Sequence, residues 1–150
     1  MVLPSLACQA QCSYCFGPNQ GPMMRDDIFD AALDWIAATT PSDQSLELTF
    51  HGGEPLLAGH AWYRRNLPRL RSRFGDRLKL GIQSNLWLLD DDYCELFRER
   101  RVSIGTSLDG PEAINDAQRG AGYFGRTMAG IEAARRHGMS VGVICTFTRR

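Results

Sequence analysis

The sequence has no excess of charge of either sign. Its 150 residues include 17 basic and 17 acidic side chains, so the formal net charge is zero. Nucleic acids and anionic membranes attract proteins that carry a basic surplus. We therefore expect neither of them as a partner.

Long apolar runs are also missing. No stretch approaches the roughly 20 consecutive apolar residues that cross a bilayer. The N-terminal residues have neither the basic segment nor the long apolar stretch of a secretory signal. The sequence therefore predicts a cytoplasmic protein.

The sequence does not have the even cysteine count of a disulfide framework. It has five cysteines, and three of them, Cys8, Cys12 and Cys15, are crowded into CQAQCSYCF. Secreted scaffolds spread an even number of cysteines along a short chain, so this arrangement favours a reduced compartment and metal ligation. Cys145 lies in an apolar run, and Cys94 lies between Tyr93 and a Glu-Leu-Phe segment. We interpret both as small buried side chains.

Strand and helix patterns alternate along the chain, with no linker, repeat or low-complexity tract. In the helix expected at residues 125–138, Met128, Ile131 and Ala134 should face the core. Five parallel strands with intervening helices predict an α/β fold, a partial barrel truncated after about strand five. We interpret residues 1–150 as a single domain that is part of a larger barrel or is completed by a partner. Strands are expected at residues 2–7, 46–50, 78–83, 102–108 and 140–147, and helices at residues 26–36, 61–74, 88–100 and 125–138.

Polar motifs follow four of the predicted strands. The cysteine loop follows the first strand, HGGEP (51–55) the second, QSN (83–85) the third and SLDG (107–110) the fourth. In barrels of parallel strands, functional loops gather at the carboxyl ends of the strands. We therefore expect these motifs to form one site.

The cysteine spacing admits two kinds of site. Cys-x3-Cys-x2-Cys supplies three soft ligands, one fewer than a closed tetrahedral zinc site needs. A zinc site would need Cys94, Cys145 or a histidine as well, and would make the chain a zinc-stabilised binding module without catalysis. Three thiolates on a four-iron cluster would instead leave one iron open for chemistry.

The segment CQAQCSYC resembles the signature of the radical S-adenosylmethionine (SAM) enzymes, Cys-x3-Cys-x-aromatic-Cys. The resemblance implies that Cys8, Cys12 and Cys15 hold a 4Fe–4S cluster and that Tyr14 lies near the adenine of SAM. It also implies that one electron, from a reductant such as flavodoxin or ferredoxin, cleaves SAM to a 5′-deoxyadenosyl radical that abstracts hydrogen from a substrate.

Two further segments carry the resemblance. LTFHGGEPLL (48–57) resembles the family's GGEP motif, which implies that Gly52, Gly53 and Glu54 bind the amino group of SAM. QSNLWLL (83–89) resembles the family's Thr-Asn-Gly strand ending, which assigns a SAM contact to Asn85, with Leu86 in place of the glycine. A polar turn is the alternative role for Asn85.

The segment TSLDGPEAINDAQRG (106–120) resembles a narrower branch, the sulfatase-maturase-like, peptide-modifying enzymes that usually carry a SPASM extension. The resemblance implies that Ser107 and Arg119 hold the carboxylate of SAM, and a guanidinium suits a carboxylate well. Asn115 stands where this branch usually has histidine. A solvated loop arginine is the alternative for Arg119.

The resemblance implies a radical SAM core domain over residues 1–150, without a SPASM or auxiliary-cluster domain. The expected reaction is hydrogen abstraction from a peptide or protein, such as a precursor peptide or a sulfatase. The alternative within the superfamily is a small-molecule enzyme resembling the molybdenum-cofactor cyclase. The catalytic base is not assigned to any residue of this chain.

Three other features receive structural interpretations. GAGYFG (120–125) fits Gly-x-Gly-x-x-Gly but lacks a preceding strand, so we expect a helix entry. His51 is expected to make a local hydrogen bond. The arginines of residues 61–74 are expected to spread over a solvated face.

Overall fold

The computed structural model describes residues 1–148, and its centre is a four-stranded parallel sheet. The strands lie in the sequential order β1-β2-β3-β4, so each crossover moves in the same direction, as it does in a barrel. The predictions for β1 and β2 are confirmed residue for residue, and β3 and β4 are shorter than predicted. The strands are β1 (Leu46–Phe50), β2 (Leu78–Gln83), β3 (Val102–Ser107) and β4 (Val141–Ile144).

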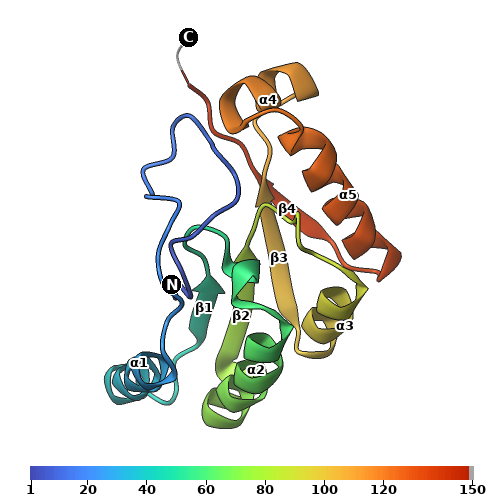
Figure 1. Ribbon diagram of the computed structural model, residues 1–150. Helices are drawn as coiled ribbons and strands as arrows, with labels where there is room; N and C mark the ends of the chain where they lie inside the picture. Colours follow the sequence, from blue (N-terminus) through green and yellow to red (C-terminus); the bar gives the residue numbers. More distant parts are fainter. Residues whose placement is uncertain (149–150) are drawn as a thin grey trace.

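Helices cover one face of the sheet. Figure 1 shows α2, α3 and α5 along one side of the strands, with α1 beside β1. The opposite face carries exposed polar side chains, among them Glu47, Lys79 and Ser103. The helices are α1 (Asp26–Thr39), α2 (His60–Phe74), α3 (Asp91–Glu99), α4 (Glu112–Arg119) and α5 (Tyr123–Arg136), with short 3-10 turns η1 (Pro55–Ala58) and η2 (Gly75–Arg77).

The core lies between the sheet and these helices. Side chains alternate across each strand, so every second residue of β1, β2 and β3 is buried against the helices. Aromatic rings fill much of the space, with Tyr63 of α2 packed edge-on against Phe50, Tyr93 and Phe97. The open polar face and the carboxyl ends of the strands are thereby left free for a ligand.

The predicted first strand, residues 2–7, is wrong. Only Val2 pairs with the sheet, through a single parallel bridge to Phe50. Pro4 has no amide hydrogen to donate to a ladder. The carbonyls of Ser5 and Ala7 instead accept hydrogen bonds from the amides of Gly53 and Glu54. The N-terminal segment therefore packs on the loop after β1, and the described residues form four strands rather than five.

Two predictions about helices also need correction. Helix α4 was not predicted, because its sequence is mostly polar and lacks a clear apolar period. Two residues do mark its ends, Pro111 before its first turn and Gly120 after its last. In α5, Met128 is exposed and does not face inward, whereas Ala134 is fully buried and Ile131 is partly buried as expected. The glycine-rich segment 120–125 leads into α5, which confirms its interpretation as a helix entry.

The arginines of α2 are more ordered than predicted. Three of them, spaced four residues apart, form ion pairs with three aspartates of α1 that share the same spacing. This spacing places each set in one row along its helix, so these three arginines form a stripe that the sequence did not predict. Because the side chains remain partly exposed, each pair is expected to add at most about 1 kcal/mol. The pairs are Arg65–Asp26, Arg69–Asp30 and Arg73–Asp34.

Leu86 occupies a backbone conformation that normally requires glycine. Its φ is 66°, yet its side chain is only 1% exposed. Gly130 of α5 leaves room for it, since a Cβ atom at position 130 would lie 2.5 Å from the Cβ of Leu86. The loop after β2 thus keeps the left-handed turn of a glycine while burying a leucine.

Replacing Leu86 by glycine is therefore expected to destabilise the chain by about 2 kcal/mol, because the packing that is lost outweighs the strain that is relieved. Losing a buried leucine costs about 2–5 kcal/mol, which exceeds the roughly 1–2 kcal/mol of left-handed strain that is relieved. Urea unfolding measures the effect. Arg101→Gly is the control, because Arg101 has a φ of 53° but is exposed, and it should stay within about 1 kcal/mol of wild type. A stabilised Leu86→Gly variant would contradict this balance.

Candidate functional site

One cavity at the carboxyl ends of the strands collects every site residue that the sequence predicts. Its volume is about 390 Å³. Its wall comes from the N-terminal loop, the segments after β1 and β2, the end of β3 and the end of α4. The predicted residues on this wall are Cys8, Cys12, Tyr14, Cys15, Gly52, Gly53, Glu54, Asn85, Ser107 and Arg119.

Backbone hydrogen bonds fix the shape of the cysteine loop. The amide of Cys15 donates a hydrogen bond to the carbonyl of Cys12 at 3.0 Å, which closes a tight turn. The amide of Ser13 donates to the carbonyl of Gln118 at 2.7 Å, which docks the loop on the end of α4. Figure 1 shows the loop above the carboxyl ends of the strands, beside the chain that follows β4.

The three loop thiols are free and partly accessible. The sulfur of Cys8 accepts a hydrogen bond from the amide of Ala10, and the sulfur of Cys15 accepts one from the amide of Gly17, both at 3.4 Å. Burial raises the pKa of the Cys8 and Cys12 thiols, and the positive charge of Arg119 opposes this rise at Cys12. Within residues 1–148, no group of three or more histidine, cysteine or acidic side chains is arranged to hold a single metal ion.

The two remaining cysteines lie outside this cavity. Cys94 is fully buried in α3, as predicted for a small core side chain. Cys145 is exposed, so the prediction that it is buried is wrong. It follows the last residue of β4, at the edge of the sheet, where no described element covers it. The apolar run around it belongs to an edge strand.

The double glycine after β1 allows two backbone segments to meet. A Cβ atom on Gly53 would lie 2.2 Å from the carbonyl oxygen of Ala7, and one on Gly52 would lie 2.4 Å from that of Ser5. Only glycine avoids such overlap, so these residues bring the loop after β1 against the segment that leads into Cys8. His51 accepts a hydrogen bond at Nδ1 from the amide of Gly52, the expected local role.

Glu54 is a buried carboxylate at the wall of the cavity. It is 1% exposed and accepts hydrogen bonds from the Ser84 hydroxyl and from the amides of Leu56 and Asn85, all within 2.9 Å. Burial raises the pKa of Glu54, and these donors counteract the rise. Three internal donors leave one of its four acceptor positions for a ligand. Glu54 thus also ties the loop after β1 to the loop after β2.

Asn85 points its side chain toward the cysteine loop. Its Nδ2 lies 3.9 Å from the sulfur of Cys8, and its Oδ1 accepts a hydrogen bond from the amide of Trp87 at 3.0 Å. The bond to Trp87 is the polar turn that the sequence offered as an alternative role. Asn85 is therefore a turn former whose amide also faces Cys8, and its contact with SAM stays a prediction.

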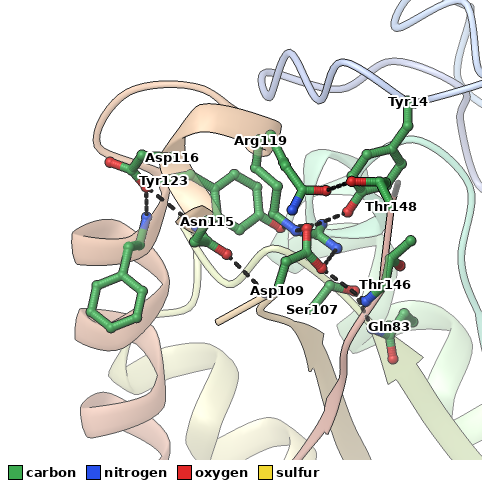
Figure 2. Close-up of polar contacts among 12 residues, drawn as sticks. Tyr14, Gln83, Ser107, Asp109, Asn115, Asp116, Arg119, Tyr123, Thr146 and Thr148 are labelled. Atoms are coloured by element: carbon green, nitrogen blue, oxygen red, sulfur yellow. Dashed lines mark hydrogen bonds and ion pairs between the residues drawn. The ribbon is translucent and has the colours of Figure 1, made fainter. Parts of the chain in front are cut away.

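Ser107 and Arg119 each make hydrogen bonds that the sequence did not predict. The Ser107 hydroxyl accepts a hydrogen bond from Nε2 of Gln83 at 3.1 Å. Arg119 is buried and donates from Nε and Nη2 to the carboxylate of Asp109, at 2.8 and 2.9 Å, so it is not a solvated arginine. Figure 2 shows this pair with Tyr14 and Tyr123 around it. Asp109 is part of the SLDG motif, but the motif alone gave it no role.

The Asp109 carboxylate predicts a pH effect on stability. Burial favours a higher pKa, but hydrogen bonds from Arg119, Tyr14 and the amide of Thr146 outweigh it and hold the pKa of Asp109 below its ordinary value. An acid with a depressed pKa stabilises the fold fully above its unfolded pKa, near 4, and loses that effect as pH falls through its folded value. The stability difference between wild type and Asp109→Asn should therefore shrink as the pH falls below about 4.

Urea unfolding from pH 6 to pH 3 measures this difference. Comparing the two proteins at each pH cancels the contribution of Glu54 to the pH dependence of stability. The raised pKa of Glu54 makes that contribution opposite in sign to the contribution of Asp109. A difference that is independent of pH would show that Asp109 has the same pKa in the folded and unfolded chains.

None of the helices in the described part of the chain combines the length and apolarity needed to cross a membrane.

Comparisons with known proteins identify the family of this chain. The family model of the Radical SAM superfamily matches residues 2–148. An uncharacterised protein of Methanothermobacter thermautotrophicus is 45% identical over 150 residues, which cover 99% of this chain and 56% of that protein. The serine-type anaerobic sulfatase-maturating enzyme of Klebsiella aerogenes is 34% identical over 144 residues, covering 87% of this chain and 35% of the enzyme. The chain therefore spans between about a third and just over half of these relatives.

Solved structures share the fold. Native anSMEcpe with bound AdoMet matches with a TM-score of 0.83 at 22% identity, over 95% of this chain and 42% of that one. The radical SAM methyltransferase TsrM of Kitasatospora setae matches with a TM-score of 0.64 at 17% identity, over 97% of this chain and 30% of that one. Together with the family match over residues 2–148, the cysteine loop and the cavity lead to one conclusion: this chain belongs to the radical SAM superfamily.

Proposed function

We propose that this chain binds a 4Fe–4S cluster and SAM in the cavity and uses them to abstract hydrogen from a peptide or protein side chain. The observation that carries the proposal is that all ten residues assigned from the sequence motifs line this one cavity. They come from five segments that are spread along the chain between Cys8 and Arg119. Convergence of this kind is typical of a binding site and is not expected of unrelated turns.

The residues fit an iron–sulfur cluster. Cys8, Cys12 and Cys15 are free, lie on one wall of the cavity and offer soft sulfur donors. The amides of Ala10 and Gly17 already donate toward two of the sulfurs, and hydrogen bonds of this kind stabilise thiolates on a cluster. With three protein ligands, a four-iron cluster keeps one iron for SAM.

The wall also fits the two charges of the methionine part of SAM. Glu54 contributes a carboxylate with one acceptor position left, which suits the ammonium group. Arg119 uses Nε, Nη1 and Nη2 once each toward Asp109 and Tyr123, which leaves two N–H groups of its guanidinium. We assign the carboxylate of SAM to these N–H groups and to the Ser107 hydroxyl. Gly52 and Gly53 let the backbone come close to the ligand, and Tyr14 is assigned to the adenine.

When bound, a cluster of this kind supplies the electron that cleaves SAM and so generates the radical that abstracts hydrogen. The chain's own residues then orient SAM by its charged ends and keep water away from the reactive part. Asn85 is assigned a position beside Cys8 and SAM, since its amide faces that sulfur at 3.9 Å.

The substrate class rests on similarity to peptide-modifying enzymes. The segment 106–120 resembles the motif of the sulfatase-maturase branch, and the 34% identical Klebsiella enzyme is a serine-type anaerobic sulfatase-maturating enzyme. A solved structure of anSMEcpe with AdoMet and the Cp18Cys peptide also shares this fold, with a TM-score of 0.83. A peptide or protein substrate, a flavodoxin or ferredoxin reductant and a cytoplasmic location are all part of the proposal.

Single-turnover assays on the full 150-residue chain test the function. The chain is reconstituted anaerobically with iron and sulfide, reduced with dithionite and incubated with SAM. The expected product is 5′-deoxyadenosine, and none should form if iron is omitted. A synthetic sulfatase peptide deuterated at the Cβ of its serine or cysteine should transfer deuterium into that product. Absence of 5′-deoxyadenosine would overturn the radical function, and its formation without deuterium transfer would overturn the peptide assignment.

A further inference from the structure

The Asp109 carboxylate is buried behind the cavity and joins four segments of the chain. Its side chain is 0% exposed and that of Arg119 is 7% exposed. Oδ1 accepts from Nη2 of Arg119 and from the amide of Thr146, and Oδ2 accepts from Nε of Arg119 and from the Tyr14 hydroxyl. Figure 2 shows these donors converging on Asp109. The carboxylate thus has four donors, which use its full acceptor capacity.

The donors come from segments that lie far apart in the sequence. Tyr14 belongs to the cysteine loop, Arg119 ends α4, and Thr146 follows β4, while Asp109 itself follows β3. The Tyr14 hydroxyl lies 2.6 Å from Oδ2 of Asp109 across 95 positions of sequence. Asp109 does not line the cavity, whereas Tyr14 and Arg119 do. Its contacts with the site therefore pass through these two side chains.

Arg119 connects Asp109 to the cysteine loop. Its guanidinium lies between two aromatic rings, 5.3 Å from the centre of Tyr14 and 5.2 Å from that of Tyr123. The carbonyl of the preceding residue, Gln118, accepts a hydrogen bond from the amide of Ser13 at 2.7 Å. One face of the cysteine loop is therefore docked on Asp109, Arg119 and the end of α4.

We propose that Asp109 is a positioning residue, which holds Tyr14 and Arg119 on one carboxylate so that the loop carrying Cys12 and Cys15 is ordered before any cluster binds. Its role differs from that of an ordinary buried ion pair, whose net effect on stability is often small. The loop has no helix or strand of its own, so these side-chain contacts add to the backbone hydrogen bonds of Ser13 and Cys15 in ordering it.

Amide hydrogen exchange on the cluster-free chain tests the proposal. The amides of Ser13 and Cys15 are the reporters, because both are hydrogen-bonded within the docked loop. Tyr14→Phe removes one hydroxyl and keeps the ring, so the fold should survive, and exchange at the reporters should rise several-fold. Asp109→Asn removes the charge that pairs with Arg119, and exchange at the reporters should rise about tenfold. Amides of β2 serve as the internal reference for global stability.

Asp34→Asn is the matched control, since it breaks the surface pair of Asp34 with Arg73 and should leave the loop amides unchanged. The proposal is overturned if exchange at Ser13 and Cys15 stays at the wild-type rate in both variants. It is also overturned if exchange there rises only in step with the amides of β2, because that is the effect of a general loss of stability. The experiment uses no iron and no SAM, so its failure is distinguishable from failure of the proposed function.

Discussion

Replacing Cys12 by alanine is expected to abolish the cleavage of SAM while leaving the chain folded. The three thiols at the cavity wall are the whole protein ligand set that we propose for the cluster. Loss of outer-shell partners of metal sites costs about 10–100-fold, so loss of a ligand should cost more. Cys12 is only partly buried, so its truncation removes little packing. Product analysis for 5′-deoxyadenosine measures the loss, and circular dichroism measures the fold.

Cys145→Ala is the matched control for this variant. It also removes a thiol, but Cys145 is exposed and lies outside the cavity. Its iron content and SAM cleavage should equal those of wild type. Cleavage retained in Cys12→Ala, or lost in Cys145→Ala, would contradict the assignment of the ligands.

Replacing Gly53 by alanine should produce the second large effect, on both stability and SAM binding. The new Cβ would lie 2.2 Å from the carbonyl oxygen of Ala7 and 2.4 Å from that of Leu6. Both neighbours are backbone atoms, so the clash cannot be relieved by turning a side chain, and the two segments must separate. Overpacking of this kind costs about 1–3 kcal/mol, occasionally more. The displaced loop also carries Glu54, so affinity for SAM should fall with stability.

Gly125→Ala separates this clash from a general effect of adding a methyl group. Gly125 lies in α5, where an added Cβ would meet no atom within 4 Å beyond its chain neighbours and the backbone of its own helix. Alanine favours helices by about 1 kcal/mol over glycine. This variant should be as stable as wild type or more stable, with unchanged SAM affinity. Urea unfolding and equilibrium dialysis of labelled SAM measure both quantities. A Gly53→Ala chain with wild-type stability and affinity would contradict the proposed packing of the loop.

Much of the site follows from the sequence because its motifs lie at the ends of periodic strands. The alternation in LELTF and LKLGIQ fixed β1 and β2 to the residue, and their ends fixed where HGGEP and QSN must lie. Parallel strands bring their carboxyl ends to one edge of a sheet, so the loops meet in space whatever their separation in sequence. The motifs therefore predicted a shared cavity without any knowledge of its contacts.

The contacts within the site could not be predicted, because they depend on side chains that meet only in the folded chain. Nothing in the sequence around Tyr14 indicates that its hydroxyl reaches Asp109, 95 positions away. The N-terminal segment gave a strand-like pattern, but its carbonyls bond to the loop after β1. Leu86 departs from the family's glycine, yet it keeps the left-handed turn because Gly130 makes room for it.

The most direct test of the central claim is the spectrum of the reconstituted chain with and without SAM. After anaerobic loading and reduction, we expect about four irons per chain and an electron paramagnetic resonance signal of a reduced 4Fe–4S cluster. Adding SAM should change that signal, because a ligand on the fourth iron alters its environment. A colourless chain with one zinc and no iron, or a cluster signal that SAM leaves unchanged, would contradict a cavity in which three cysteines leave one iron for SAM.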